Sequence, residues 1–135
     1  MNTKNDLPSA HTESPFKGKT GLARIWNAFF YSLEGIKAAY QHEDAFRQEV
    51  LLAAIMTPAA LFCPVSPVEK AIMIASVLLV VIVELLNSAV EAAIDRISLD
   101  RHLLSKRAKD IGSAAVLVSL VNVVMVWVLI LLPKL

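Results

Sequence analysis

The sequence predicts an all-α membrane protein with an N-terminal amphipathic surface helix and three transmembrane helices. Apolar residues make up 56% of the 135 residues, which is more than a small soluble core can bury. They gather in blocks without Lys or Arg that approach the length of a bilayer span. These blocks cover residues 50–65, 71–94 and 111–132.

Each block predicts one transmembrane helix, with spans over about 46–65, 70–94 and 110–132. The third span is the clearest, since its only strongly polar residues are two serines and one asparagine. The first is the weakest because it is short and contains Pro58. A re-entrant or interfacial helix therefore stays open as the alternative for this segment.

The 13 Lys and Arg residues predict the orientation of the chain. Six precede the first apolar block, one lies between the first and second blocks, five lie between the second and third, and one follows the third. Positive residues of short loops stay on the cytoplasmic side. We therefore expect a cytoplasmic N-terminus and a periplasmic C-terminus, and the basic residues do not require a nucleic-acid partner.

The segment before the first span has two parts. Residues 1–20 are polar and almost free of apolar residues, so we predict a disordered cytoplasmic tail before a membrane domain at 21–135. Over about 22–40, apolar residues recur three and four positions apart. This spacing is typical of an amphipathic helix, which we expect to lie at the inner membrane surface.

The second span carries a stripe of polar residues. At about 100° per residue, Asn87, Glu91 and Asp95 stand at about 300°, 340° and 20° from Glu84, so all four share one side of a helix. A solvated helix end explains Asp95 and also fits Glu91. It does not explain Glu84, because the thirteen largely apolar residues before it cover only about 20 Å of a core of about 30 Å. An acid at this depth indicates function.

Depth along the stripe suggests two chemical roles. Glu91 lies about 10 Å nearer the aqueous end than Glu84. Together with Glu43, which precedes the first span, Glu91 can hold Mg²⁺ jointly with substrate phosphates. The deeper Glu84 can accept a proton from a lipid hydroxyl.

Basic residues near the stripe offer contacts to phosphate. Lys109 opens the third span and Arg24 lies on the surface helix, and both side chains suit phosphate oxygens. For other basic residues, retention on the cytoplasmic side is at least as good an explanation; these are Arg101, Lys106 and Arg107. Small residues four positions apart, such as Ala108 and Gly112, predict close helix packing.

Three segments together resemble the bacterial integral-membrane diacylglycerol kinases. The resemblance covers about Gly21 to the C-terminus and implies a homotrimer of the bacterial inner membrane. It also implies transfer of the γ-phosphate of Mg-ATP to diacylglycerol, which yields phosphatidic acid. The segments are Ala45 to Glu49, Glu84 to Glu91 with Asp95 and Arg96, and Lys106 to Ala115.

The resemblance further implies roles for individual residues. Glu84 would be the catalytic base with Asn87 beside it, and the metal ligands would be Glu43 and Glu91. The implied nucleotide contacts are Arg24, Tyr31, Glu43, Glu91, Asp100, Arg101, His102, Lys109 and Asp110. The implied lipid contacts are Arg24, Arg47, Glu49, Lys70, Glu84, Ser113 and Trp127.

Geometry supports an oligomer independently, because three helices cannot enclose a polar stripe within lipid. We expect sites that combine the surface helix of one subunit with the stripe of another. Three rival functions stay open on the sequence alone. An undecaprenol kinase of the same fold is the nearest, and a proton or ion transporter or a structural subunit would belong to other classes.

Overall fold

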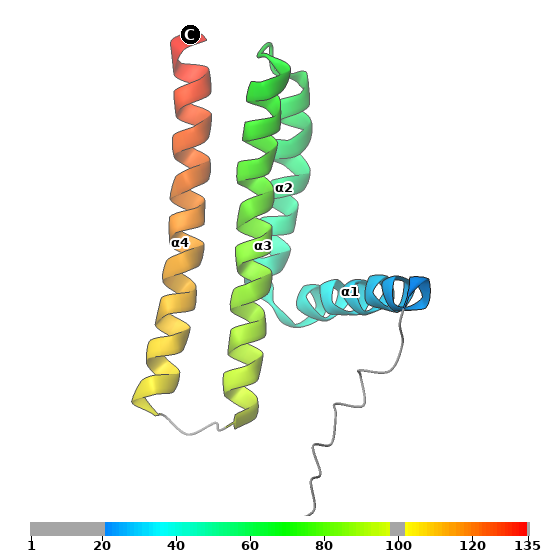
Figure 1. Cartoon of the computed structure of the whole chain (residues 1–135). Coiled ribbons are helices and arrows are strands. Elements are labelled where there is room, and N and C mark those ends of the chain that lie inside the picture. The colour runs from blue at the N-terminus through cyan, green and yellow to red at the C-terminus, as the bar shows by residue number, and fades with distance from the viewer. Residues whose placement is uncertain (1–20, 98–101, 135) are drawn as a thin grey trace, which may run out of the picture. The chain divides into compact units, whose positions relative to one another are not determined.

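The computed structural model describes residues 21–97 and 102–134 (Figure 1). The predicted tail at 1–20 and the candidate site residues Asp100 and Arg101 lie outside this part of the chain. Within it the fold is all-α, as predicted. The elements are α1 (Leu22–His42), α2 (Asp44–Phe62), α3 (Pro67–Ile97), α4 (Leu103–Leu131) and a short 3-10 helix, η1 (Leu132–Lys134).

Three of these helices are long and apolar enough to cross a membrane, which confirms the number of candidate spans. Helix α2 runs 19 residues and continues through Pro58, whereas α3 and α4 run 31 and 29 residues. At about 1.5 Å per residue, α3 is about 46 Å long and exceeds a hydrocarbon core of about 30 Å. Helices α3 and α4 therefore extend beyond the predicted spans, because their polar ends are also helical.

Helix α3 is the central element of this bundle, since it packs against both α2 and α4. Among the described residues α2 and α4 form no helix pair with each other. A small core joins the three helices, with Val77 and Val80 of α3 packed against Val123 of α4. Partly buried residues that surround this core are Ala53, Met56, Leu120 and Trp127.

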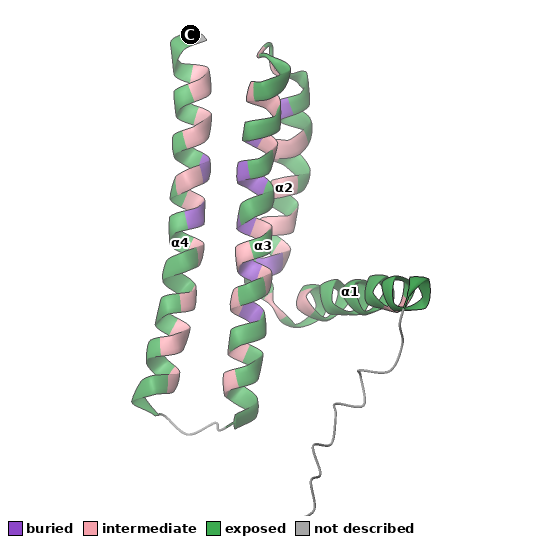
Figure 2. Cartoon of the chain, in the orientation of Figure 1, coloured by how far each residue is buried: buried purple, intermediate pink, exposed green. Residues whose placement is uncertain are grey.

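Most of the outer surface of the bundle is apolar and exposed (Figure 2). Leu117 and Leu129 of α4, for example, are 62% and 69% exposed. Large apolar surfaces of this kind suit a lipid environment better than water. The buried serines Ser76 and Ser119 donate to carbonyls of their own helices, at 2.7 Å each, so these two hydroxyls have partners.

The connection between α2 and α3 ends in a capping box. Ser66 precedes α3, and its Oγ accepts from the backbone N–H of Glu69 at 3.3 Å. In return, Glu69 Oε2 accepts from the backbone N–H of Ser66 at 2.7 Å. Pro67 takes the first helical position, where a missing N–H costs nothing. This short motif fixes the start of α3.

The described chain divides into a unit that ends at Glu34 and a unit that begins at Gly35. In the first unit, three aromatic rings of α1 form a local cluster. The ring centroids of Trp26 and Phe30 lie 5.2 Å apart, and those of Phe29 and Phe30 lie 5.8 Å apart. The second unit contains α2, α3, α4 and the end of α1.

Candidate active site

Helix α3 carries the polar stripe without interruption from Glu84 to Asp95. Glu84 is only 4% exposed, and Ser88 one turn later is 8% exposed. Glu91 is half-buried and Asp95 is exposed. Exposure therefore rises along the stripe away from Glu84, in the direction that the sequence predicted.

Glu43 lies at a corner in the backbone between two helices. Its φ and ψ of −116° and 113° make it the one extended residue between α1 and α2. Its backbone N–H still donates to Ala39 O at 2.9 Å, and its carbonyl accepts from the N–H of Arg47 at 3.3 Å. Both helices therefore use the backbone of Glu43, and its side chain lies at their junction.

Carboxylates from two helices gather around Glu84. Glu43 and Glu91 both lie close enough to Glu84 to interact with it electrostatically. Glu49 of α2 is a further neighbour of Glu84. One oxygen of Glu49, Oε2, is buried without a hydrogen-bond partner among the described residues. The sequence resemblance placed Glu49 near lipid, but no spacing rule could have shown its proximity to Glu84 across two helices.

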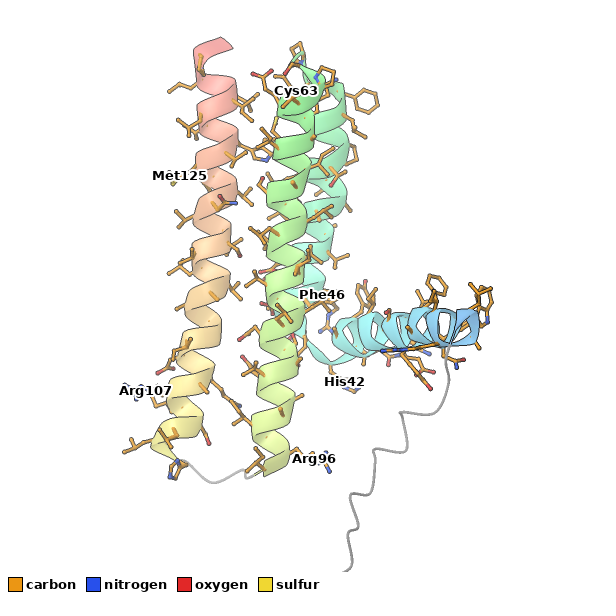
Figure 3. All side chains as sticks on the ribbon, in the orientation of Figure 1. His42, Phe46, Cys63, Arg96, Arg107 and Met125 are labelled. Carbon is orange, nitrogen blue, oxygen red and sulfur yellow. The ribbon has the colours of Figure 1, made fainter. Side chains whose placement is uncertain are left out.

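An ion pair joins the polar ends of α3 and α4. Lys109 Nζ lies 2.6 Å from Asp95 Oδ1. Lys109 also interacts electrostatically with Glu91 and Glu43. The same region holds Arg96 and Arg107, and Cys63 lies at the opposite end of the bundle (Figure 3). The lysine therefore faces the carboxylate cluster, where a phosphate would need a positive partner.

Asn87 connects the stripe internally. Its Nδ2 donates to Glu91 Oε1 at 3.1 Å across one helical turn. This bond orients the half-buried carboxylate of Glu91. Asn87 is thus in direct contact with a predicted metal ligand as well as one turn from the predicted base.

The carboxylates of Glu43 and Glu91 are chemically suited to Mg²⁺, which typically takes one or two carboxylates together with substrate phosphates and water. Within residues 21–97 and 102–134, no group of three or more His, Cys, Asp or Glu side chains is arranged to hold a metal. Glu43 and Glu91 therefore offer two carboxylate donors for such an ion.

Several predicted lipid contacts have partners within the protein. Arg47 Nη1 donates to the carbonyls of Tyr40 and Gln41, at 3.0 and 3.3 Å, and Arg47 also pairs with Asp44. Lys70 Nζ donates to Leu61 O at 2.6 Å, near the α2–α3 connection. These bonds satisfy carbonyls at the ends of α1 and α2.

The other predicted lipid contacts differ in burial. Ser113 is exposed on α4. Trp127 packs against the core, and its Nε1 is buried without a partner in the described part of the chain. Within the described residues neither side chain is hydrogen-bonded to the carboxylates near Glu84, so the structure does not join Ser113 and Trp127 to this site.

The predicted nucleotide contacts are dispersed. Asp110 is exposed and pairs with Lys106 at 2.8 Å. His102 Nδ1 accepts from the N–H of Leu104 at 3.2 Å and so caps α4. Arg24 and Tyr31 are exposed and belong to the first unit. Of the nucleotide group, the structure brings together Glu43, Glu91 and Lys109.

The fold and this site define an integral-membrane protein with ionisable groups between its helices, a class that contains both enzymes and transporters. Residues 30–131 match the family described as prokaryotic diacylglycerol kinase. The chain belongs to this family and is a kinase.

Relatives named diacylglycerol kinase agree with the family match. The chain is 58% identical over 119 residues to a diacylglycerol kinase of Pseudomonas aeruginosa, covering 88% of this chain and 97% of the relative. It is 51% identical over 108 residues to the Haemophilus influenzae diacylglycerol kinase, covering 80% and 92%. It is 46% identical over 112 residues to the Escherichia coli diacylglycerol kinase, covering 83% and 92%.

Proposed function

We propose that this protein transfers the γ-phosphate of Mg-ATP to the hydroxyl of diacylglycerol and so forms phosphatidic acid. The family and the names of the relatives support the reaction class. The single observation that supports the site is Glu84, a carboxylate that is 4% exposed within a long apolar helix. An acid so placed is costly and indicates chemistry.

Glu84 acts as the general base. The lipid hydroxyl loses its proton to the Glu84 carboxylate as its oxygen forms a bond to the γ-phosphorus, and the bond from that phosphorus to ADP breaks. Phosphoryl transfer has a loose transition state, so positioning of the reactants contributes as much as proton removal.

Glu43 and Glu91 hold Mg²⁺, which neutralises phosphate charge when it is bound. Lys109 binds a phosphate oxygen as a point charge. The proximity of Lys109 to Glu43 and Glu91 supports this grouping. The remaining nucleotide contacts that we propose are Arg24, Tyr31, Asp100, Arg101, His102 and Asp110, with Asn87 beside the base.

The lipid contacts fall into two groups along the helices. Arg47 and Glu49 of α2 contact the headgroup near Glu84, and Ser113 contacts lipid from α4. Lys70 precedes Glu84 by about 21 Å of helix rise, so it and Trp127 contact lipid away from the reacting hydroxyl. Arg24 joins the first group from the surface helix.

We also propose the assembly and the membrane placement. The protein is a homotrimer of the bacterial inner membrane, with a cytoplasmic N-terminus and a periplasmic C-terminus. Helix α1 lies at the cytoplasmic surface as an amphipathic helix, and residues 1–20 form a disordered tail before the membrane domain. An oligomer is supported by the outer part of the stripe, because Glu91 is only half-buried and Asp95 is exposed within one chain, so a neighbouring subunit could cover them.

The direct test supplies purified protein in mixed micelles with labelled ATP, Mg²⁺ and one lipid alcohol at a time. We expect label in phosphatidic acid when diacylglycerol is present. Label only in undecaprenyl phosphate would show that the protein is an undecaprenol kinase of the same fold. Transfer to no lipid would contradict the proposed reaction.

Shared sites are tested by mixing two inactive variants. Glu84→Gln and Glu43→Ala chains are unfolded together and reassembled, with each variant reassembled alone as the control. We expect partial activity only in the mixture, because some sites would draw both intact residues from different chains. No gain in confirmed mixed trimers would mean that each site is built within one chain.

A further inference from the structure

Gly112 of α4 lies directly against the side chain of Asn87 of α3. A Cβ built on Gly112 would collide with Asn87 Oδ1 and would lie 3.2 Å from Asn87 Cγ. Gly21 and Gly35, the other glycines in the described part of the chain, have nothing within 4 Å of such a Cβ. The lack of a side chain at Gly112 is therefore what gives the Asn87 amide its room.

The chemistry of the neighbours fixes which way this amide points. Glu91 Oε1 can only accept, so the group that faces it at 3.1 Å must be the Asn87 nitrogen. The oxygen of the amide then faces the opposite way, toward Gly112. Asn87 Oδ1 is buried and has no hydrogen-bond partner within the described residues. The bond from the nitrogen to Glu91 and the closeness of Gly112 to the oxygen together define the position of the amide.

We propose that Gly112 is a positioning residue for the kinase reaction. Its bare α-carbon lets α4 approach α3 closely enough to confine the Asn87 amide, and the confined amide orients the Glu91 carboxylate toward Mg²⁺ and nucleotide. The inference rests on the proposed role of Glu91 in metal binding. This role differs from helix packing alone, because a change at Gly112 should weaken nucleotide binding only when Asn87 is present.

The test compares Gly112→Ala, Asn87→Ala and the double variant, with Gly35→Ala as the matched control. The affinity of each protein for a non-hydrolysable ATP analogue with Mg²⁺ is measured in micelles by calorimetry, beside the KM for diacylglycerol and thermal unfolding. Loss of a bond to a charged group predicts affinity about ten-fold weaker for each single variant. The KM for lipid should stay the same. Gly35→Ala should change neither nucleotide affinity nor KM, although an alanine within α1 should slightly raise thermal stability.

The double variant separates positioning from packing. In the Asn87→Ala background the new methyl group at position 112 meets no amide, so it should weaken nucleotide affinity no further. A double variant about a hundred-fold weaker than the unaltered protein would show independent effects and overturn the inference. Normal nucleotide affinity in Gly112→Ala would also overturn it.

Two further outcomes are decisive. If Gly112→Ala fails to fold, a folded double variant with the affinity of Asn87→Ala would support the contact, and an unfolded double variant would contradict it. Glu91→Ala separates this inference from the proposed function. If Glu91→Ala binds the ATP analogue weakly and Gly112→Ala binds it normally, only the positioning role of Gly112 is wrong. If Glu91→Ala binds the analogue normally, the assignment of Glu91 as a metal ligand is wrong.

Discussion

The two halves of α3 differ in whether their polar groups have hydrogen-bond partners. At its start, Ser66 and Glu69 satisfy each other through two backbone bonds, and Lys70 satisfies the carbonyl of Leu61. Along its second half, Glu84 is buried among other carboxylates, and an oxygen of Asn87 is buried without a partner in the described residues. The satisfied groups shape the start of α3, and the buried carboxylate indicates the reaction site. Lack of a partner alone does not indicate it, because Trp127 Nε1 also has none among the described residues.

Energetics explain why this difference is informative. Removing a carboxylate from water costs several kcal/mol, and a neighbouring carboxylate raises that cost. An apolar residue in place of Glu84 would pack in α3 without such a cost. A fold that keeps Glu84 next to Glu43, Glu49 and Glu91 gains no stability from this arrangement, so the cluster is best explained by chemistry.

The largest expected effect comes from Glu84→Gln. Loss of the base should lower kcat by about 100-fold or more, whereas the free energy of unfolding should stay the same or rise because a buried charge is gone. Phosphate transfer in mixed micelles and denaturant unfolding measure the two quantities. Near-normal turnover would end the general-base assignment.

Ser119→Ala is the matched control for that variant. Ser119 is also buried, at 3% exposed, but its hydroxyl already donates to Val116 O within its own helix. We expect normal turnover and a change in unfolding free energy of about 1 kcal/mol. A loss of turnover as large as that of Glu84→Gln would show that burial of a polar group does not distinguish the site.

The next largest effects should come from Glu43→Ala and Glu91→Ala. Each removes a proposed ligand of Mg²⁺, so the Mg²⁺ and ATP concentrations for half-maximal rate should rise about ten-fold. Excess Mg²⁺ should restore part of the rate. Glu69→Ala makes the same change near the other end of α3 and should lower stability only. A changed KM for lipid with an unchanged KM for ATP would contradict the division of roles along the stripe.

The polar stripe of α3 and the number of spans could be predicted from the sequence. Helical spacing alone placed Glu84, Asn87, Glu91 and Asp95 on one side of a helix, because α3 is regular. The three spans followed from apolar length, although the helical ends of α3 and α4 extend beyond them, since hydropathy does not report where a polar helix stops.

Contacts between helices could not be predicted. The pairing of Asp95 with Lys109, the approach of Glu49 to Glu84 and the contact of Gly112 with Asn87 depend on helix rotation and register. A single sequence contains no measure of either quantity. Small-residue spacing did indicate that Gly112 packs closely, but it did not identify the side chain that it contacts.

A smaller effect is expected from Asp95→Asn. The ion pair with Lys109 is partly exposed, with side chains 49% and 36% accessible, so its loss should lower the free energy of unfolding only slightly at low salt. The cost should shrink at high salt because ions screen exposed charges. Unfolding at two salt concentrations checks this, and a salt-independent cost would show that Asp95 acts through another contact.

The smallest effect on the reaction should come from Ser66→Ala at the start of α3. This variant removes the hydroxyl that accepts from the N–H of Glu69, and loss of such a cap typically costs about 1 kcal/mol of stability. Glu84 lies 18 residues further along the chain, about 27 Å along the helix axis, so kcat and the KM values for ATP and lipid should stay normal. Kinetics in mixed micelles together with denaturant unfolding give both readings on one preparation. A clear fall in kcat without loss of folded protein would mean that the two ends of α3 are coupled, and the separation between a structural and a reactive end would no longer stand.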